Sequence, residues 1–338
     1  MIITVKTSFD MSSYEKINYL LRPNKSVERK MVCEMLSSIS TVNDMTTYQY
    51  IGFGSTYFAD FSLFHRNLGI SQMISIEGEE RATDRCEFNK PFSCIELKIG
   101  ESSNVLPNLK INSKNSIVWL DYDGIISETV FSDINTVVGM MRPDSFFMLS
   151  INAELRMLQM ETTEEGENDP RQALISRIGE QRFPNQYREQ KLKDQLYLKI
   201  LYQCIMQEIQ TVIQKRNGME ENKVIFHQSI HFEYRDGARM ITIGGFLFQE
   251  DEEESHLNKM GIQHLSFYRN SSTAYSIKCP ILSLREIQEL NSHLPCKAMN
   301  EKGVFEDEEL NKFPIDNRDI NQYALLYRYF PNYAETLL

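Results

Sequence analysis

The sequence predicts an α/β protein whose core is a doubly wound, seven-stranded, mostly parallel sheet closed by an antiparallel hairpin. Three observations lead to this fold class. Short apolar runs alternate with helical patterns between residues 48 and 151. Such runs, separated by helices, are typical of parallel strands that are buried on both faces. Asp236 and Gly237 separate two β-rich runs, which is a strong hairpin pattern.

The apolar runs predict five parallel strands, and helices are expected between and after them. The expected strands are 48–51, 72–77, 93–99, 116–123 and 145–151. The helical patterns lie at 56–68 and 127–141, and a long helix at 185–216 precedes the hairpin. With the two hairpin strands of 223–249, the predicted sheet has seven strands.

A basic helical segment precedes the sheet. Residues 12–40 are expected to be helical, with Ser26 as the N-cap and an apolar stripe that contains Val27 and Met31. Arg22 and Lys25 in this segment are candidate contacts for a substrate or an anion. A solvated helix face is the alternative interpretation of these two cations.

We expect four segments along the chain. Residues 1–40 form an N-terminal helical segment, and residues 41–160 with 223–249 form the core. Residues 161–222 form an insert with an acidic loop and the long helix. Residues 250–338 form a C-terminal accessory region with a short capped helix at 283–290 and a tyrosine-rich end.

Composition and charge exclude some classes of protein. Hydrophobic residues make up 41% of the chain and charged residues 25%, as in ordinary globular proteins. The chain has no apolar run of transmembrane length and no pattern of a secretory signal. The net charge of −11 disfavours broad adhesion to nucleic acid or anionic membranes. The six scattered cysteines predict buried, reduced thiols in a cytoplasmic protein.

Chemistry-bearing residues follow four consecutive predicted strands. Gly52 and Gly54 follow the first strand, but Tyr57 stands where a dinucleotide fingerprint has its third glycine. By itself this loop could be a plain strand-to-helix turn. Glu77 ends the second strand, Glu101 follows the third, and L-D-Y-D-G (120–124) ends the fourth. In open α/β sheets, ligands bind at such carboxyl ends.

These motifs and the closing hairpin resemble class I S-adenosylmethionine-dependent methyltransferases, over residues 48–151 and 223–249. The resemblance implies a Rossmann-like fold with S-adenosylmethionine as cofactor. It also implies that Gly52, Gly54 and Ser55 approach the methionine part of the cofactor. Glu77 would hold the ribose, Glu101 and Ser102 would flank the adenine, and Asp121 would lie beside the transferred methyl group.

The sequence departs from the family pattern at two places. Tyr50 stands where the first strand usually ends in an acid, so Asp60 or Asp121 would have to replace that acid. The L-D-Y-D-G motif partly resembles the D-P-F-G or D-P-Y-G of enzymes that methylate guanine amines in transfer RNA. Its proline is replaced by Tyr122, and the aromatic residue that would stack on a flipped base is replaced by Asp123.

Candidate catalytic residues are Asp121 and Asp123, either of which could accept a proton from the methyl acceptor. The alternative for this pair is a helix cap plus a cofactor contact. His227 and His231 are expected on one face of a strand. Without a third ligand they are interpreted as ordinary sheet residues, and no metal site is predicted.

The sequence therefore predicts a methyltransferase acting on an oxygen or nitrogen acceptor, small or macromolecular. The alternative is a catalytically silent subunit that acts as a binding or assembly module. Interleaved basic and aromatic residues at 171–191 could bind nucleic acid or dock a partner, and the net charge disfavours nucleic acid. Acidic tracts at 161–169 and 249–254 and the tyrosine-rich C-terminus are candidate protein-binding surfaces; no membrane partner is expected.

Overall fold

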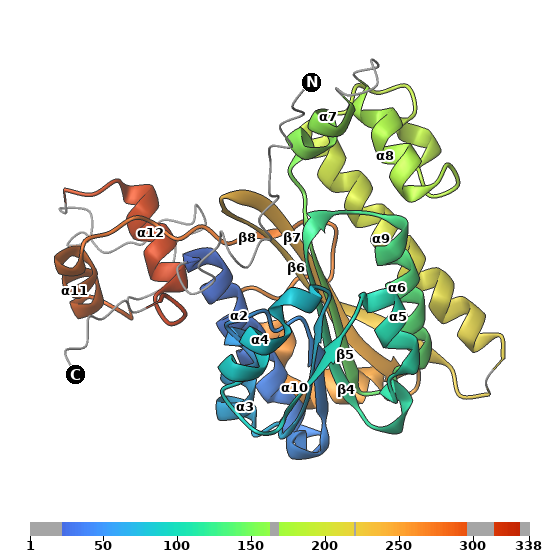
Figure 1. Cartoon of the computed structure of the whole chain (residues 1–338). Helices are drawn as coiled ribbons and strands as arrows, with labels where there is room; N and C mark the ends of the chain where they lie inside the picture. The colour runs from blue at the N-terminus through green and yellow to red at the C-terminus, as the bar shows by residue number, and fades with distance from the viewer. Residues whose placement is uncertain (1–21, 163–168, 220, 296–313, 332–338) are drawn as a thin grey trace, which may run out of the picture.

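An eight-stranded sheet forms the centre of the computed structural model, which describes residues 22–162, 169–219, 221–295 and 314–331 (Figure 1). Its strand order is β3-β2-β1-β4-β5-β7-β6-β8. The strands are β1 (Gln49–Gly52), β2 (Gln72–Glu77), β3 (Ile95–Ile99), β4 (Ser116–Ile125), β5 (Ser145–Asn152), β6 (Val224–Asp236), β7 (Ala238–Gln249) and β8 (Tyr275–Ser276).

The first five strands are parallel and β7 joins β5 in the antiparallel direction, as predicted from the apolar runs and the Asp-Gly turn. The predicted count of seven strands is wrong by one. The additional strand β8 pairs in parallel with β6, where Phe232 faces Tyr275. A strand of two residues is too short to carry an alternation pattern, so this edge strand could not be predicted from the sequence.

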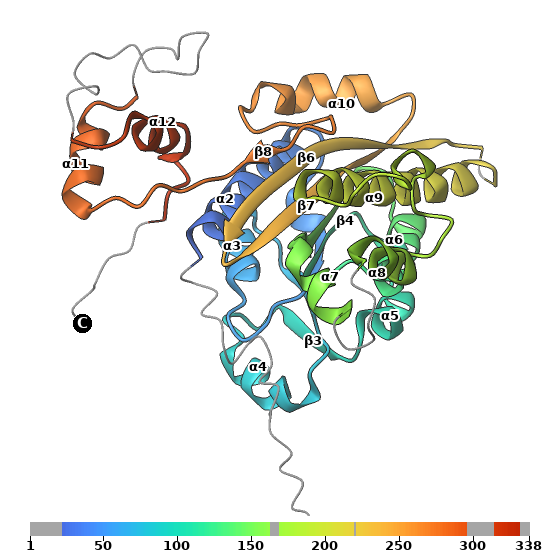
Figure 2. The same ribbon diagram turned by 90° about the horizontal axis from the view of Figure 1, so that it is seen from above.

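Helices cover both faces of the sheet (Figure 2). Helices α2 (Pro23–Ser37), α3 (Ala59–Leu68) and α10 (Glu253–Met260) lie on one face, and α5 (Ser102–Val105), α6 (Glu128–Met140) and α9 (Asp194–Asn217) lie on the other. The remaining α-helices are α4 (Thr83–Asn89), α7 (Leu155–Thr162), α8 (Pro170–Ile178), α11 (Leu284–Ser292) and α12 (Asn317–Leu326). Short 3₁₀ turns are η2 (Ser38–Thr41), η3 (Met45–Thr47), η4 (Glu80–Ala82), η5 (Leu106–Asn108), η6 (Ile111–Ser113), η7 (Asn185–Tyr187) and η8 (Ile262–His264).

Helix α2 begins at Pro23, where a missing N–H costs nothing because the first helical amides have no partner in any case. Ser26 was expected as the N-cap, but the helix begins earlier, with Arg22 at the cap position. Val27 and Met31 are fully buried, which confirms the predicted apolar stripe. The part of the expected helix before residue 22 lies outside the described residues.

Asn24, at the start of α2, bonds to residues that are far away in the sequence. Its Nδ2 donates to Asp236 Oδ1 at 2.8 Å, and its Oδ1 accepts from the backbone N–H of Cys279 at 2.7 Å. The backbone N–H of Lys25 donates to Asp236 Oδ2 at 2.8 Å. The tip of the β6–β7 hairpin thus fixes the beginning of α2.

Helix α9 is shorter than the predicted helix 185–216. It begins at Asp194, because η7 and irregular chain occupy residues 185–193. Its buried residues Leu201, Ile205 and Ile209 contribute to the core between α9, α6 and the sheet, where burial of each such side chain is worth roughly 1.5–3 kcal/mol.

A β-bulge in β6 places the two histidines of that strand on opposite faces, contrary to the expectation that they share one face. The register shifts between Gln228 and Ile230, and this extra residue reverses the side-chain alternation. His227 bonds to Glu253 and Tyr268, whereas His231 stacks on Tyr202 of α9. Both histidines therefore have structural partners.

Helices α11 and α12 stand apart from the sheet at one side (Figures 1 and 2). Ser283 caps α11 in a complete capping box with Glu286, as the sequence pattern suggested. The chain after α12 returns to α2, where Tyr329 donates to Glu34 and Lys30 Nζ donates to the carbonyl of Phe330 at 3.0 Å. No helix in the described ranges is long and apolar enough to cross a membrane.

Candidate functional site

A pocket of about 260 Å³ opens at the carboxyl ends of β1, β2, β3 and β4. The sheet order reverses between β1 and β4, which is the usual ligand position in open α/β sheets. Seven of the residues proposed from the sequence line this pocket together, namely Gly54, Ser55, Glu77, Glu101, Ser102, Asp121 and Asp123. Gly52, Arg22 and Lys25 are not among its lining residues.

The glycines after β1 are required by packing inside the protein. A Cβ on Gly52 would lie 2.6 Å from the hydroxyl oxygen of Tyr50, and one on Gly54 would lie 2.5 Å from Ser75 Oγ. The backbone N–H of Gly54 already donates to Ser75 Oγ. Ser55 and Phe58 adopt left-handed backbone conformations, with φ of 49° and 48°. Such conformations cost energy in non-glycine residues, so the surrounding packing must hold this loop in place.

Asp60 places a carboxylate near the end of β1. Tyr50 is fully buried, and its hydroxyl donates to Asp60 Oδ2. Asp60 lies in the first turn of α3 and lines the pocket. Burial raises the pKa of Asp60, while Arg29 and the Tyr50 hydrogen bond act in the opposite direction. The carboxylate near Tyr50 is therefore carried by the helix that follows β1.

The carboxylates of β2 and β3 lie on another side of the pocket. Glu77 at the end of β2 accepts from the backbone N–H of Glu79 at 3.1 Å, and burial raises its pKa. A Cβ on Gly78 would lie 3.6 Å from Glu101 Oε1, which brings these two strand ends together. This arrangement fits a ligand with a pair of hydroxyl groups such as a ribose.

Strand β4 includes the whole L-D-Y-D-G motif, but its pairing with β5 is irregular between Asp121 and Ile125. Tyr122, at the position of the family's proline, donates to Asp133 Oδ2 of α6 at 2.5 Å. Ser102 donates to the same oxygen at 2.5 Å, so its hydroxyl is engaged away from the pocket. Asp121 and Asp123 lie on either side of Tyr122 and line the pocket, with Asp123 exposed.

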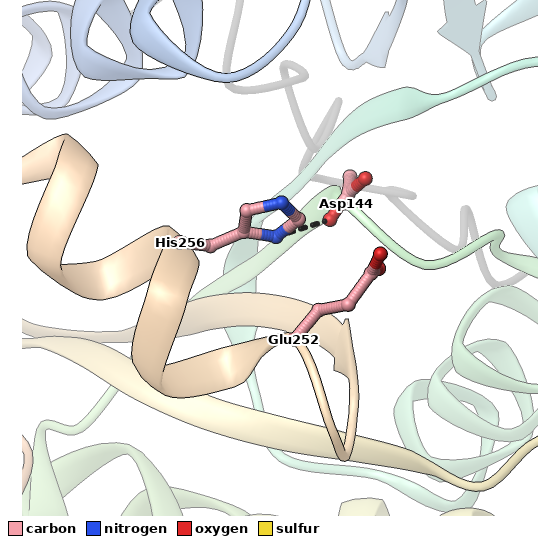
Figure 3. Close-up of side chains that lie close together, drawn as sticks. All are labelled: Asp144, Glu252 and His256. Atoms are coloured by element: carbon pink, nitrogen blue, oxygen red, sulfur yellow. Dashed lines mark ion pairs between the residues drawn. The ribbon is translucent and has the colours of Figure 1, made fainter.

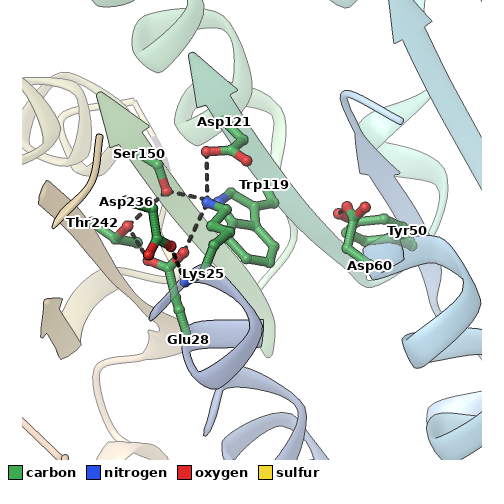
Figure 4. A network of polar contacts seen from close by, with 9 residues as sticks. All are labelled: Lys25, Glu28, Tyr50, Asp60, Trp119, Asp121, Ser150, Asp236 and Thr242. Carbon is green, nitrogen blue, oxygen red and sulfur yellow. Dashed lines mark hydrogen bonds and ion pairs between the residues drawn. The ribbon is translucent and has the colours of Figure 1, made fainter. Parts of the chain in front are cut away.

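Lys25 reaches Asp121 through a buried polar network (Figure 4). Its Nζ lies 2.7 Å from Asp121 Oδ1 and 2.8 Å from Glu28 Oε2, and 4.4 Å from the ring centroid of Trp119. Glu28 also accepts from Thr242 Oγ1, and burial raises the pKa of Glu28. The Lys25 side chain is 1% exposed, so it does not belong to a solvated helix face. The free anion contact expected from the sequence is instead an internal pair with Asp121.

Arg29 lines the same pocket, one helical turn after Lys25. Its Nε is buried and has no hydrogen-bond partner among the described residues. The sequence showed Arg29 only as one of several cations in a basic helix. Its spacing of four residues from Lys25 is the pattern that places both side chains on one face of α2.

A second group of polar side chains lies at the amino end of β5, away from the strand ends that form the pocket (Figure 3). Asp144, Glu252 and His256 are close enough together to share a metal ion. His256 Nδ1 lies 3.1 Å from Asp144 Oδ1, and Asn43 donates to the other Asp144 oxygen at 3.1 Å. These contacts join α10 to the start of β5, so a structural pair accounts for them.

The basic and aromatic segment 171–191 is largely engaged within the insert. Arg182 Nε donates to Glu208 at 2.8 Å, and Arg188 pairs with Glu180. Phe183 is 2% exposed and belongs to the core against α9. These contacts leave the segment poorly suited to track a nucleic acid strand.

The profile of a family described as "Putative O-methyltransferase" matches residues 17–338. This match agrees with the methyltransferase resemblance and with S-adenosylmethionine as the cofactor. No curated protein matches the sequence significantly.

Several solved structures share parts of the fold. Trm1 from Pyrococcus horikoshii with S-adenosyl-L-methionine is 10% identical at a TM-score of 0.44, over 70% of this chain and 58% of that one. An O-methyltransferase from Bacillus cereus with SAH is 13% identical at a TM-score of 0.34, over 70% and 92%. A Haloferax volcanii complex of a methyltransferase with its activator Trm112 is 9% identical at a TM-score of 0.30, over 38% and 55%. The chain thus spans just over half the length of two of these structures.

Proposed function

Because the chain belongs to the putative O-methyltransferase family, we propose that it transfers a methyl group from S-adenosylmethionine to a hydroxyl oxygen of its acceptor. The observation that carries the proposal is Asp121, which ends the buried part of β4, lines the pocket and is held by Lys25 at 2.7 Å. When bound, S-adenosylmethionine supplies a methyl group whose bond to sulfur breaks as the acceptor oxygen bonds to that carbon.

The residues present fit this cofactor. The turn after β1, Glu77 and Glu101 line one pocket, whose carboxylates can accept from the hydroxyl and amino groups of the cofactor. We assign Ser55 and the Gly54 backbone to the methionyl part, Glu77 to the ribose hydroxyls, and Glu101 to the adenine edge. Gly52 helps to shape this loop from inside the protein. Ser102 supports the site through its hydrogen bond to Asp133.

Asp121 is the group that deals with the acceptor proton. A hydroxyl group must lose its proton as the new bond to carbon forms, and a carboxylate within hydrogen-bond reach accepts that proton. Lys25 is a positioning residue, since it donates to Oδ1 and keeps the Asp121 side chain in one orientation. Glu28, Trp119 and the hairpin tip in turn hold Lys25.

The test separates binding from chemistry. Calorimetry with S-adenosylhomocysteine measures cofactor binding, and transfer from labelled S-adenosylmethionine to hydroxyl or amine acceptors in a metabolite pool measures turnover. We expect Asp121→Asn to lower turnover roughly 100-fold or more while the Kd for S-adenosylhomocysteine changes little. Lys25→Met should lower kcat more than it raises KM, since Asp121 loses the partner that orients its side chain.

The other outcomes distinguish the alternatives. If Asp123→Asn abolishes turnover and Asp121→Asn does not, the base is Asp123. Transfer to amines alone would overturn the assignment of an oxygen acceptor. Binding without transfer to any acceptor would favour the silent assembly subunit, for which the acidic tract 249–254 is the candidate partner surface. Tyr323 and Tyr329 are 2% and 7% exposed, which makes these two tyrosines poorer candidates.

A further inference from the structure

Helix α2 places one guanidinium group in an otherwise acidic pocket. Six carboxylate residues line the pocket, and Arg29 is its only basic lining residue in the described ranges; the acids are Asp60, Glu77, Glu79, Glu101, Asp121 and Asp123. A negatively charged group of a ligand would be repelled by most of this surface. Arg29 is therefore the position at which a ligand carboxylate can be held.

The Arg29 side chain has donor capacity that the protein does not use. Its Nε is buried without a hydrogen-bond partner among the described residues. A buried donor without a partner is unfavourable, and an acceptor on a ligand would remove that penalty. Guanidinium groups suit carboxylates, since two parallel N–H bonds match the two oxygens.

Arg29 and Asp60 both line the pocket, and they carry opposite charges. The positive charge of Arg29 acts to lower the pKa of the Asp60 carboxyl, against the larger effect of burial. Tyr50 donates to Asp60 Oδ2 only, which leaves Oδ1 able to accept from a ligand. One cation next to one carboxylate is complementary to a zwitterionic amino acid group. Asp60 follows β1, whereas Glu77 and Glu101 follow β2 and β3, so this pair lies apart from the ribose and adenine positions.

We propose that Arg29 binds the carboxylate of the cofactor's methionyl group and that Asp60 accepts from its ammonium group. This inference rests on the proposed function, because it assigns a part of the same cofactor. It gives one face of helix α2 two roles. Lys25 holds Asp121, and Arg29, four residues later, holds the cofactor.

The experiment measures affinity with and without the ligand carboxylate. Calorimetry compares S-adenosylhomocysteine with its decarboxylated analogue, S-adenosyl-3-thiopropylamine, for the full chain and for Arg29→Ala. We expect Arg29→Ala to weaken S-adenosylhomocysteine roughly 10- to 100-fold, as for the loss of a charged hydrogen-bond pair. Affinity for the decarboxylated analogue should change less than about threefold. Arg29→Lys should restore part of the loss, because it keeps the charge without the fork.

The neighbouring cation gives a matched control. Lys30 belongs to the same helix and donates to the carbonyl of Phe330, away from the pocket. Lys30→Ala removes the same charge and should leave the affinity for S-adenosylhomocysteine within about threefold. Thermal unfolding of each variant shows whether it is folded.

Three results would overturn the inference, and they differ from one another. Equal weakening of both ligands by Arg29→Ala would mean that Arg29 only supports the fold. No weakening of either ligand would mean that the carboxylate binds elsewhere. If the unaltered protein binds neither ligand, the proposed function fails, and this inference fails with it.

Discussion

Several carboxyl groups in and around the pocket have pKa values above their usual range. Burial raises the pKa of Glu28, Asp60, Glu77 and Asp133. Asp133 illustrates the effect best, since its partners are two hydroxyl groups and no cation. Ser102 and Tyr122 both donate to Oδ2, and Oδ1 has no hydrogen-bond partner among the described residues.

Asp133→Asn should change how stability depends on pH. A raised pKa means that the folded protein holds the Asp133 proton more tightly than the unfolded chain. This contribution to stability is complete below pH 3.8 and is lost as pH rises through the pKa of the folded state. The variant lacks that loss, so its free energy of unfolding relative to the wild type should increase from acid to neutral pH. Urea unfolding at several pH values measures it.

Asp44→Asn is the control with the opposite sign. Hydrogen bonds from Thr46 lower the pKa of Asp44, so its contribution is present above pH 3.8 and is lost as pH falls. The Asp44→Asn protein should therefore be less stable than the wild type near neutral pH, and this difference in unfolding free energy should shrink towards acid pH. Parallel pH curves for both variants would contradict this account of Asp133.

At the residue scale, the sequence indicated which strand ends carry polar groups but not their partners. Asp121 was found as the end of an apolar run, whereas its partner Lys25 lies 96 residues away on a helix. The importance of a glycine at position 52 was also predictable from the sequence. The reason for it was not, because it is the close approach of the Tyr50 hydroxyl. Arg29 could not be selected among neighbouring cations, because only tertiary packing decides which of them faces the pocket.

Among the elements, the bulge of β6 depends on a glycine in the neighbouring strand. A Cβ on Gly245 would collide with the backbone of β6, including Gln228 Cα at 2.8 Å. Gly245→Ala should therefore cost about 3 kcal/mol of unfolding free energy, because backbone cannot move aside as a side chain can. Chemical denaturation measures this difference.

Gly139 of α6 offers the matched comparison. The nearest atom to a Cβ there is Val212 Cγ1 at 3.8 Å, and its backbone is helical. Gly139→Ala should raise the free energy of unfolding by roughly 0.5–1 kcal/mol, because alanine is favoured over glycine inside helices. A Gly245→Ala protein as stable as Gly139→Ala would show that the bulge rearranges freely.

Elements with a strong local pattern were predictable, and those set by packing were not. The five parallel strands and the Asp236-Gly237 hairpin follow from apolar runs and turn chemistry, and the structure confirms them. The bulge escaped prediction because it is imposed by the pairing of two strands. The start of α9 was misplaced because residues 185–193 contain helix-forming residues that are used in a turn instead.

For the molecule as a whole, α2 joins the pocket to both the hairpin and the C-terminal region. Asn24→Ala removes its side-chain bonds to the hairpin tip and to Cys279 without touching the pocket. We expect lower stability, by about 1–3 kcal/mol, and weaker binding of S-adenosylhomocysteine, since Lys25 and Arg29 lose their fixed support. Calorimetry and thermal unfolding measure the two effects.

Asn67→Ala is the corresponding control, because exposed Asn67 bonds only locally, to the carbonyl of Leu63 within α3. It should leave cofactor binding unchanged. If Asn24→Ala lowers stability yet leaves affinity intact, α2 is held sufficiently by its apolar stripe, and the hairpin contact has no bearing on the site.

The bonds of Asn24 also bear on the order of events during synthesis. A ribosome produces α2 early, but Asp236 and Cys279 follow 212 and 255 residues later. Until then the helix has its apolar stripe but not the groups that orient its first turn. Domains whose contacts span such distances complete their structure late. Cofactor capture by the nascent chain should therefore begin only after Cys279 has left the ribosome.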